Sequence, residues 1–141
     1  MKVLFDANVL LDVLLAREPH LDTARKLVAL VDAQRIEGYV CATAVTTLYY
    51  IGAKTLGRND VRASLRTLLG MFRVAPVDGE VLRHALDATD FSDYEDAVVH
   101  GAAHAAGCVA VVTRDEDGFA NATMAVFQPP ALLAAVVAGS A

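Results

Sequence analysis

The sequence predicts an α/β fold, a three-layer sandwich with a mainly parallel central sheet. Short apolar runs of strand length alternate along the chain with longer segments whose apolar residues recur at helical spacing. The chain has 141 residues, of which 55% are hydrophobic and four are proline, and this suits one substantial core. We therefore expect residues 1–141 to form a single domain.

The first half of the chain reads as strand, helix, strand and then two further helices. The run KVLF predicts a buried strand at residues 2–5, and Asn8 is expected to cap the following helix. Residues 21–36 predict a second helix, which Gly38 is expected to end before a strand at 39–42. Further helices are expected at 43–54 and 60–72, the latter capped by Asn59 or Asp60.

The second half predicts the same alternation. The expected strands are residues 73–77, 108–112 and 125–127, and the expected helices are 79–88, 95–106 and a last helix after Pro130. Gly107 is expected just beyond the end of the 95–106 helix.

Composition and charge narrow the possible functions. The net charge of −5 argues against broad electrostatic affinity for nucleic acid, so any polynucleotide contact must be local. Cys41 and Cys108 lack the spacing of a zinc motif and are expected to be buried, reduced thiols, which favours a cytoplasmic protein. Polar residues interrupt the apolar N-terminus, which is therefore expected to be neither a signal peptide nor a membrane span.

Acidic residues stand in three clusters that a parallel sheet could bring together. Asp6 follows the first strand, Glu95 and Asp96 open a helix, and Asp115 follows the run VAVVT. Open parallel sheets bind ligands beyond the carboxyl ends of their strands, so these acids are expected to converge there. Two carboxylates roughly 4.5 Å apart repel by about 4 kcal/mol at an effective dielectric near 20. Such a cluster calls for a cation, and Mg²⁺ or Mn²⁺ suits oxygen ligands.

The segments VLFDANVLLD, DFSDYEDAVVHGAAHAAG and VAVVTRDEDGF, in this order, resemble the PIN-domain family of metal-dependent ribonucleases. The family includes the VapC-like toxins of bacterial toxin–antitoxin pairs, and the EDA pattern is typical of one of its branches. The resemblance implies a PIN-like fold in which Asp6, Asp96 and Asp115 bind metal and Asn8 lies beside the first acid. Glu95 matches an acid that would bind metal directly or through water. As an alternative, Glu95 is a solvated acid that favours the dipole of its helix.

The chain departs from the family pattern at one acid. Many relatives carry a glutamate on the helix after the second strand, where this chain reads TAVTTLYY and places Thr46 or Thr47. Thr47 could hold a metal-bound water, or Glu95 could replace the lost charge, and weaker metal affinity is expected. In addition, Gly118 stands before Phe119 where aspartate is commoner.

Neighbouring polar residues have two interpretations each. Asp93 and Asp117 either support the metal ligands or stabilise their own turns. Thr113 either bonds across the site or ends its strand. Arg114 either contacts the scissile phosphate or offsets the negative charge.

Three other polar residues are expected to lie outside the site. Asp12, one helical turn beyond Asn8, could face the mouth of the pocket, but a solvated helix face is favoured. His100 and His104 have the i, i+4 spacing of metal ligands but no third ligand nearby, which favours surface or interface histidines.

The acidic cluster predicts metal-assisted phosphodiester hydrolysis. The resemblance implies that the protein is a Mg²⁺- or Mn²⁺-dependent endoribonuclease that hydrolyses RNA, and the toxin of a toxin–antitoxin pair. One alternative is a PIN-fold binding module that has lost efficient metal binding. A less favoured alternative is a phosphatase phosphorylated on Asp6, but such enzymes need a second acid where Asn8 stands. The apolar segment 131–137 and the apolar faces of the helices at 21–36 and 60–72 predict a homodimer or an antitoxin complex, and no membrane partner.

Overall fold

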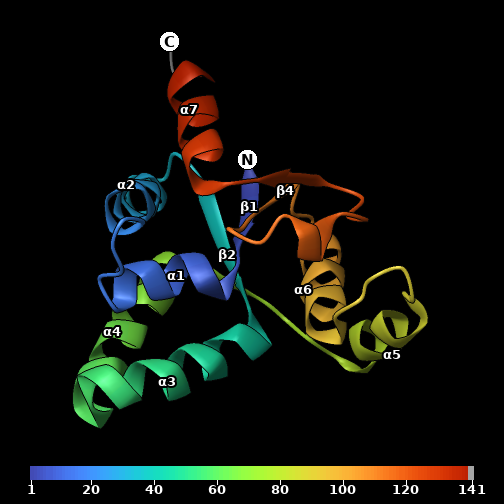
Figure 1. Cartoon of the computed structure of the whole chain (residues 1–141), viewed down its shortest axis with the longest axis horizontal. Helices are drawn as coiled ribbons and strands as arrows, with labels where there is room; N and C mark the ends of the chain where they lie inside the picture. Colours follow the sequence, from blue (N-terminus) through green and yellow to red (C-terminus); the bar gives the residue numbers. More distant parts are fainter. Residues whose placement is uncertain (140–141) are drawn as a thin grey trace.

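Five strands form a central sheet in the computed structural model, which describes residues 1–139 (Figure 1). The strands lie in the order β3-β2-β1-β4-β5, and every neighbouring pair is parallel. Their bounds are Lys2–Phe5 for β1, Glu37–Cys41 for β2, Arg73–Ala75 for β3, Ala110–Val112 for β4 and Ala125–Phe127 for β5. The predicted mainly parallel sheet is confirmed.

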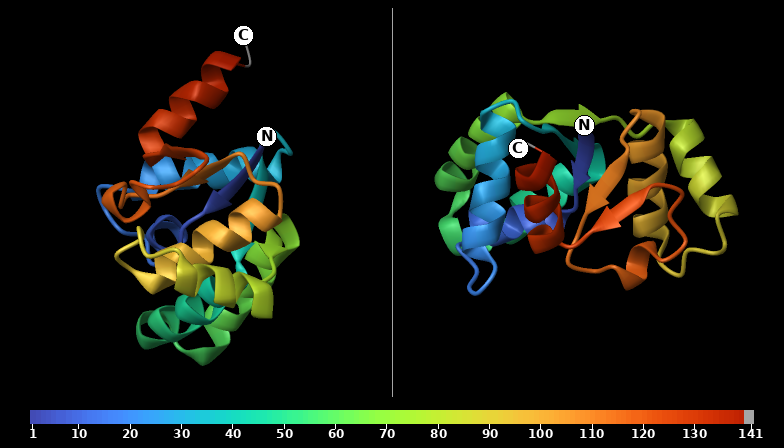
Figure 2. Two further views of the ribbon diagram at one scale, coloured as in Figure 1. Left: turned by 90° about the vertical axis from the view of Figure 1, so that its right-hand side faces the viewer. Right: turned by 90° about the horizontal axis from the view of Figure 1, so that it is seen from above.

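Helices cover both faces of the sheet and complete the predicted three-layer sandwich (Figure 2). One face carries α1 (Ala7–Leu14), α2 (Leu21–Asp32), α3 (Ala42–Leu56), α4 (Arg58–Met71) and α7 (Pro129–Gly139). On the other face, α6 (Tyr94–Ala105) packs on the sheet and α5 (Gly79–Asp87) packs on α6. A short 3-10 helix, η1 (Asp117–Phe119), precedes β5.

The core centres on β1, whose Val3, Leu4 and Phe5 are fully buried because both faces of the strand are covered. The Phe5 ring meets Phe72 edge to face, with the ring centroids 5.0 Å apart. Fully burying one such side chain stabilises the fold by about 1.5–3 kcal/mol. The middle of the sheet is therefore a rigid platform for the residues that follow β1 and β4.

The predicted cap of α1 was wrong. Asp6, and not Asn8, caps this helix, and its Oδ1 accepts a hydrogen bond from the Ala7 amide at 2.8 Å. The helix begins directly after β1, so the residue at the strand's end takes the cap position and Asn8 lies inside the first turn. The predicted cap of α4 also differs, because Gly57, at φ +83°, takes that position in place of Asn59 or Asp60.

The predicted end of α2 was wrong as well. The helix stops at Asp32, and the chain turns at Gln34, which has a φ of +60°. Gly38 lies within β2, where an added Cβ would come within 2.7 Å of the Phe72 ring. Glycine is therefore required at position 38 by close packing against Phe72, and not because a helix ends there. Gly107, at φ +81°, does follow the end of α6 as predicted.

Both cysteines are buried free thiols, as predicted. Burial raises the pKa of Cys108 to about 11, so this thiol is poorly reactive at neutral pH. Within residues 1–139, no helix has the length and apolar character needed to cross a membrane.

Candidate active site

The direction in which successive strands are added to the sheet reverses between β1 and β4, and the predicted acids lie beside this switch point. From β1 the chain continues to β2 and β3 on one side, and β4 and β5 are then added on the other side. Parallel α/β sheets bind ligands at such a switch point, beyond the carboxyl ends of the strands. Asp6 directly follows β1, and Asp115 follows β4 by three residues.

Both carboxylate oxygens of Asp6 are hydrogen-bonded, which fixes the orientation of its side chain. Besides the cap bond of Oδ1, Oδ2 accepts hydrogen bonds from the Thr113 hydroxyl at 2.9 Å and from the Asn8 amide at 3.3 Å. Thr113 is fully buried, and its hydroxyl in turn accepts a hydrogen bond from the Asp115 amide at 3.0 Å. Thr113 therefore connects the two acids that follow β1 and β4.

Asn8 ties the same two segments together a second time. Its amide nitrogen also donates to the Thr113 hydroxyl at 3.2 Å, and its Oδ1 accepts a hydrogen bond from the Arg114 amide at 3.1 Å. A side chain that joins β1 to the loop after β4 in this way explains why a polar residue stands two positions after the first acid.

Asp96 and Asp115 meet at Gly118. A Cβ placed on Gly118 would lie 2.5 Å from Oδ2 of Asp96 and 2.8 Å from Oδ2 of Asp115, so the two carboxylates face the same small space. The Gly118 amide also donates to Oδ1 of Asp115 at 3.3 Å. The structure thus brings α6 and the loop after β4 together as the sequence predicted.

Asp6, Asp96 and Asp115 lie close enough for their carboxylates to repel one another. Burial first, and then the carboxylates of Asp93, Asp6, Asp115 and Glu95, raise the pKa of Asp96 to about 7. Burial also raises the pKa of Asp6, and Asp115 raises it further, although the hydrogen bonds from Thr113 and Ala7 lower it. A cation would relieve this repulsion.

The donor set suits a hard divalent cation that keeps part of its water shell. Within residues 1–139, no three histidine, cysteine, aspartate or glutamate side chains are grouped closely enough to hold one ion between them. The repelling oxygens of Asp6, Asp96 and Asp115 nevertheless have the ligand chemistry that Mg²⁺ and Mn²⁺ prefer. Mg²⁺ is usually bound through one or two carboxylates and several waters, and such a site fits these residues.

The other predicted acids lie at the margin of this cluster. Asp93 caps α6 by accepting a hydrogen bond from the Asp96 amide at 3.2 Å, as its turn-stabilising interpretation expected. Glu95 is exposed in the first turn of α6 and is close enough to raise the pKa of Asp96. Asp117 is exposed at the start of η1, where its backbone carbonyl accepts from the Ala120 amide.

Thr46 and Thr47, which stand where many relatives carry a glutamate, form hydrogen bonds within their own helix. The Thr46 hydroxyl donates to the Thr43 carbonyl at 2.8 Å, and the Thr47 hydroxyl is 3.5 Å from the same oxygen. A hydroxyl bonded to the preceding turn is a weak substitute for a charged ligand.

The placement of Asp12 was predicted wrongly. Asp12 is fully buried, and its carboxylate accepts two hydrogen bonds from the Arg114 guanidinium, from Nε at 2.7 Å and from a terminal nitrogen at 3.1 Å. Arg114 therefore offsets a negative charge, as one of its two interpretations proposed, but the charge is that of Asp12. The i, i+4 spacing of Asn8 and Asp12 on α1 was the available signal, since both reach Arg114.

His100 is half-buried on α6 and contacts the segment before β5. Its Nε2 accepts a hydrogen bond from the Thr123 amide at 3.0 Å, and its ring lies against Phe91 with centroids 5.0 Å apart. Burial and the neighbouring His104 lower the pKa of His100, although Asp90 opposes this shift. His100 fixes the segment before β5, while His104 is exposed as expected.

Gly118→Ala should disturb the acid cluster without unfolding the protein. The new methyl group must displace the carboxylates of Asp96 and Asp115, because both oxygens lie closer to it than ordinary contact distance. We expect metal affinity to fall at least tenfold, measured by calorimetric titration with Mn²⁺. Gly70→Ala is the matched control, because an added Cβ there meets nothing within 4 Å. Equal affinity in both variants would mean that the space at Gly118 is not part of the site.

The metal-free protein should lose stability as pH rises from about 4 to about 7. The native pKa of Asp96 is about 7 against a model value of 3.8, so in this window the native state binds a proton that the unfolded state has lost. His100 acts in the opposite direction, because its native pKa is lowered. Urea unfolding in EDTA at pH 5.5 and 8.0 should therefore compare wild type with Asp96→Asn, which carries the same His100. A pH dependence unchanged by the substitution would contradict the assignment.

The chain is an α/β protein with acidic residues at the switch point of its parallel sheet, where open sheets of this kind bind ligands. The PIN-domain family model matches residues 2–117, and the chain belongs to the PIN-domain family. No curated protein matches its sequence.

Solved structures with the same fold include a toxin–antitoxin complex from Klebsiella pneumoniae. VapBC2 from Rickettsia felis, bound to a promoter DNA fragment, is 15% identical with a TM-score of 0.68, over 91% of this chain and 98% of that chain. FitAcB from Neisseria gonorrhoeae is 24% identical with a TM-score of 0.66, over 90% and 97%. VapC20 from Mycobacterium tuberculosis, a toxin that cleaves the sarcin-ricin loop, is 12% identical with a TM-score of 0.68, over 86% and 96%.

Proposed function

We propose that this protein is a metal-dependent endoribonuclease and the toxin of a toxin–antitoxin pair. The observation that carries the proposal is the convergence of Asp6, Asp96 and Asp115 at the switch point of a PIN-family sheet. VapC20, which has the same fold, is described as cleaving the sarcin-ricin loop, which supports RNA as the substrate class.

In this proposal the three aspartates hold one or two Mg²⁺ or Mn²⁺ ions, and Glu95 assists directly or through water. When bound, the cation supplies an activated water and stabilises the leaving oxygen. Asn8 and Thr113 hold the carboxylate of Asp6 in place, and Asp93 fixes the start of α6 that carries Asp96. One carboxylate accepts the proton of the attacking water.

A nuclease assay with Mg²⁺, Mn²⁺ and EDTA tests the proposal. We expect a labelled single-stranded RNA to be cut with either metal, to remain intact in EDTA, and to be cut again when Mn²⁺ is added in excess. Asp96→Asn purified in the same way controls for contaminating ribonucleases. Cleavage that persists in EDTA would contradict the mechanism.

Because threonine stands at position 47 in place of a family glutamate, a second candidate function is a binding module without efficient catalysis. A protein that binds RNA or a partner, but cuts no RNA at millimolar Mn²⁺, would support it. In either case we propose that residues 1–141 act as a single PIN domain.

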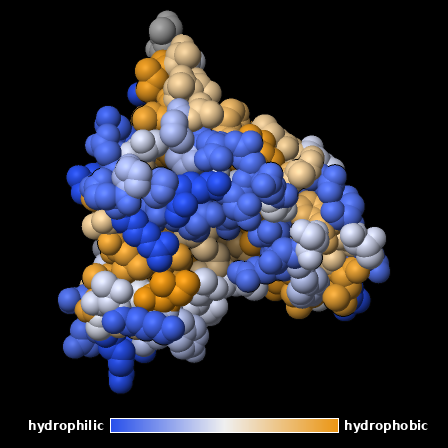
Figure 3. All heavy atoms as spheres, in the orientation of Figure 1, coloured by the Kyte–Doolittle hydropathy of each residue, from blue (hydrophilic) through white to orange (hydrophobic). Residues whose placement is uncertain are grey.

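Exposed apolar surface supports an antitoxin partner or a homodimer. Helix α7 projects from the body and carries hydrophobic side chains along its length, at the top of Figure 3. Of its side chains, Leu132 is fully buried while Val137 is 58% exposed. Part of the apolar faces of α2 and α4 packs within the chain's own core, and Leu69 on α4 remains 42% exposed. A structure of the same fold, from Klebsiella pneumoniae, is a toxin–antitoxin complex.

A further inference from the structure

A small cavity lies at the edge of the sheet where β4 and β5 end. Its walls come from three segments of the chain: residues 19–23 around the start of α2, Arg114 after β4, and residues 128–130 after β5. The volume is about 210 Å³. Pockets for drug-sized ligands occupy roughly 300–1,000 Å³, so this space suits one ring system. We refer to it as the β4–β5 cavity.

The β4–β5 cavity lies next to the acid cluster, at the same edge of the sheet. Arg114 directly precedes Asp115, and the Arg114 amide donates a hydrogen bond to Oδ1 of Asn8 at 3.1 Å. The side-chain nitrogen of Asn8 in turn donates to Asp6 at 3.3 Å. The Arg114 side chain leaves this loop toward Asp12 on α1 and borders the cavity. One extended ligand along this edge can therefore contact the acids and the cavity together.

Flat, rigid side chains form the walls of the cavity. Pro19, Pro129 and Pro130 supply three pyrrolidine rings, which restrict the motion of the backbone that carries them. The ring of His20 is half-buried and adds an aromatic surface. Unpaired RNA bases stack on aromatic side chains, histidine included. These walls therefore suit a flat ring, and little side-chain freedom is lost when one binds.

Polar groups without a partner in the chain line the same space. The Gln128 amide nitrogen donates to the Arg114 carbonyl at 3.4 Å, a long hydrogen bond. Within residues 1–139, no hydrogen bond is formed by Oε1 of Gln128, by the Thr23 hydroxyl or by the His20 ring. A few such groups in an otherwise apolar pocket fix the orientation of a bound ligand. The cavity thus offers both a face for a ring and partners for the polar atoms on its edge.

We infer that the β4–β5 cavity binds the base of an unpaired nucleotide in the RNA substrate, and so helps to select the position of the cut. A nucleobase has a flat face and carries donors and acceptors on its edge, which is the combination that the walls and the polar groups match. A base held here leaves its backbone beside the acid cluster. The choice of RNA as the ligand rests on the proposed function. Gln128, Thr23 and His20 are then specificity-determining residues, and none of them belongs to the acid cluster.

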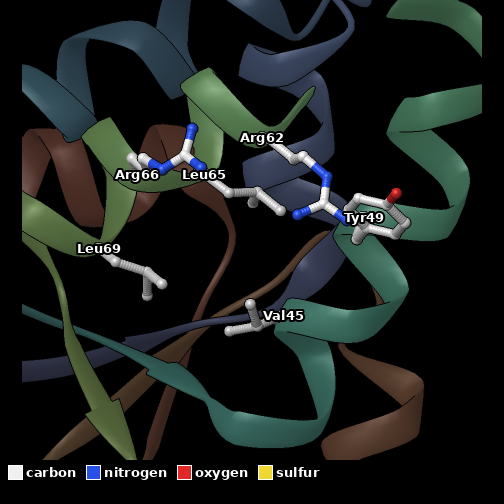
Figure 4. A pocket seen from close by; sticks show the side chains of 6 residues that line it. All are labelled: Val45, Tyr49, Arg62, Leu65, Arg66 and Leu69. Atoms are coloured by element: carbon white, nitrogen blue, oxygen red, sulfur yellow. The ribbon is translucent and has the colours of Figure 1, made fainter. Parts of the chain in front are cut away.

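The larger hollow between α3 and α4 offers no comparable place for a base (Figure 4). Its volume is about 350 Å³, and it is lined by aliphatic side chains, two arginines and one aromatic ring. That ring, Tyr49, is already covered by the Arg62 guanidinium, which lies 5.4 Å from the ring centroid. Stacking of a base needs an open aromatic face. Base recognition is therefore expected at the β4–β5 cavity.

NMR titration of the wild-type protein in EDTA tests base binding apart from cleavage. The probes are the four nucleoside 5′-monophosphates and ribose 5-phosphate, which has the same sugar and phosphate but no base. We expect saturable shifts of the His20 ring signals with at least one nucleotide, and none with ribose 5-phosphate. Gln128→Met removes the polar amide at similar size, and Thr23→Phe fills the cavity, so each should weaken binding at least tenfold. Thr67→Phe, at an exposed position on α4, is the matched control and should bind like wild type.

Sequencing of the cleavage products of a randomised single-stranded RNA tests the effect on selection. Wild type should favour one base near the cut at least tenfold, and Gln128→Met should lose that preference while it still cuts RNA. Absence of nucleotide binding, equal binding of ribose 5-phosphate, nucleotide affinity unchanged in both cavity variants, or an unchanged base preference in Gln128→Met would each overturn the inference. Nucleotide binding by a protein that cuts no RNA would refute the nuclease proposal and support the base site.

Discussion

Asp96→Asn should abolish metal-dependent RNA cleavage while the fold persists. The substitution removes a charged ligand oxygen from a cluster in which repulsion raises the pKa of Asp96 to about 7. We expect cleavage to fall by at least about a hundredfold, which corresponds to about 2.7 kcal/mol of lost transition-state stabilisation. Without metal, the variant should be as stable as wild type or more so, because a mutually repelling charge is gone. Initial cleavage rates with Mn²⁺ and urea unfolding in EDTA measure the two effects.

Two further variants make this result interpretable. Asp6→Asn should also abolish cleavage, and asparagine remains a good cap for α1 at this position. Asp87→Asn, at the end of α5, removes an exposed aspartate outside the cluster and should leave cleavage unchanged. If both Asp6→Asn and Asp96→Asn cut RNA at the wild-type rate, the proposed mechanism is refuted.

Arg114→Ala should cost the protein about 3–5 kcal/mol of unfolding free energy, the usual effect of removing one partner of a buried ion pair. The Asp12 side chain is fully buried, the Arg114 side chain is 29% exposed, and two hydrogen bonds join them. The substitution leaves the Asp12 carboxylate buried without its counterion. It also releases the loop that carries Thr113 and Asp115, so Mn²⁺ affinity should fall as well. Urea unfolding and calorimetric titration measure the two effects.

A double variant separates the ion pair from general packing. Asp12→Leu with Arg114→Met replaces both charges by apolar groups of similar size and should recover most of the lost stability. If the two single substitutions and the double one are additive, the residues are not energetically coupled in the native state. Arg25→Ala on α2, at an exposed position, is the control for the loss of an arginine and should change stability little.

The sequence was sufficient to predict the strands and the principal acids. Short apolar runs such as KVLF and VAVV are typical of strands buried on both faces of a parallel sheet, so their places in the chain predicted Asp6 and Asp115 at one edge. Asp96 could be predicted too, because it opens a helix whose small apolar residues pack on the same sheet. The resemblance to the PIN-domain family added the expected ligand roles, which the structure leaves as a proposal.

Predictions from local sequence were wrong at positions where the surrounding structure determines the role of the residue. Asn8 and Asp6 are both good helix caps by residue type, and the exact end of β1 selected Asp6. Gly38 has the residue type of a helix end, but the Phe72 ring packed against β2 is what requires glycine there. Neither choice can be made from spacing within a single element.

By itself, the sequence determined the alternation of strands and helices and the order in which the acids appear along the chain, because apolar periodicity is a local property. The tertiary structure decided which of these acids share a site. Glu95 and Asp117 remain exposed at its margin, while Gly118 leaves the space in which Asp96 and Asp115 face one another. The tertiary structure also buries Asp12, which was expected at the surface, and pairs it with Arg114, 102 positions away. Such a pairing depends on how the loop after β4 packs against α1, and no pattern within either segment specifies it.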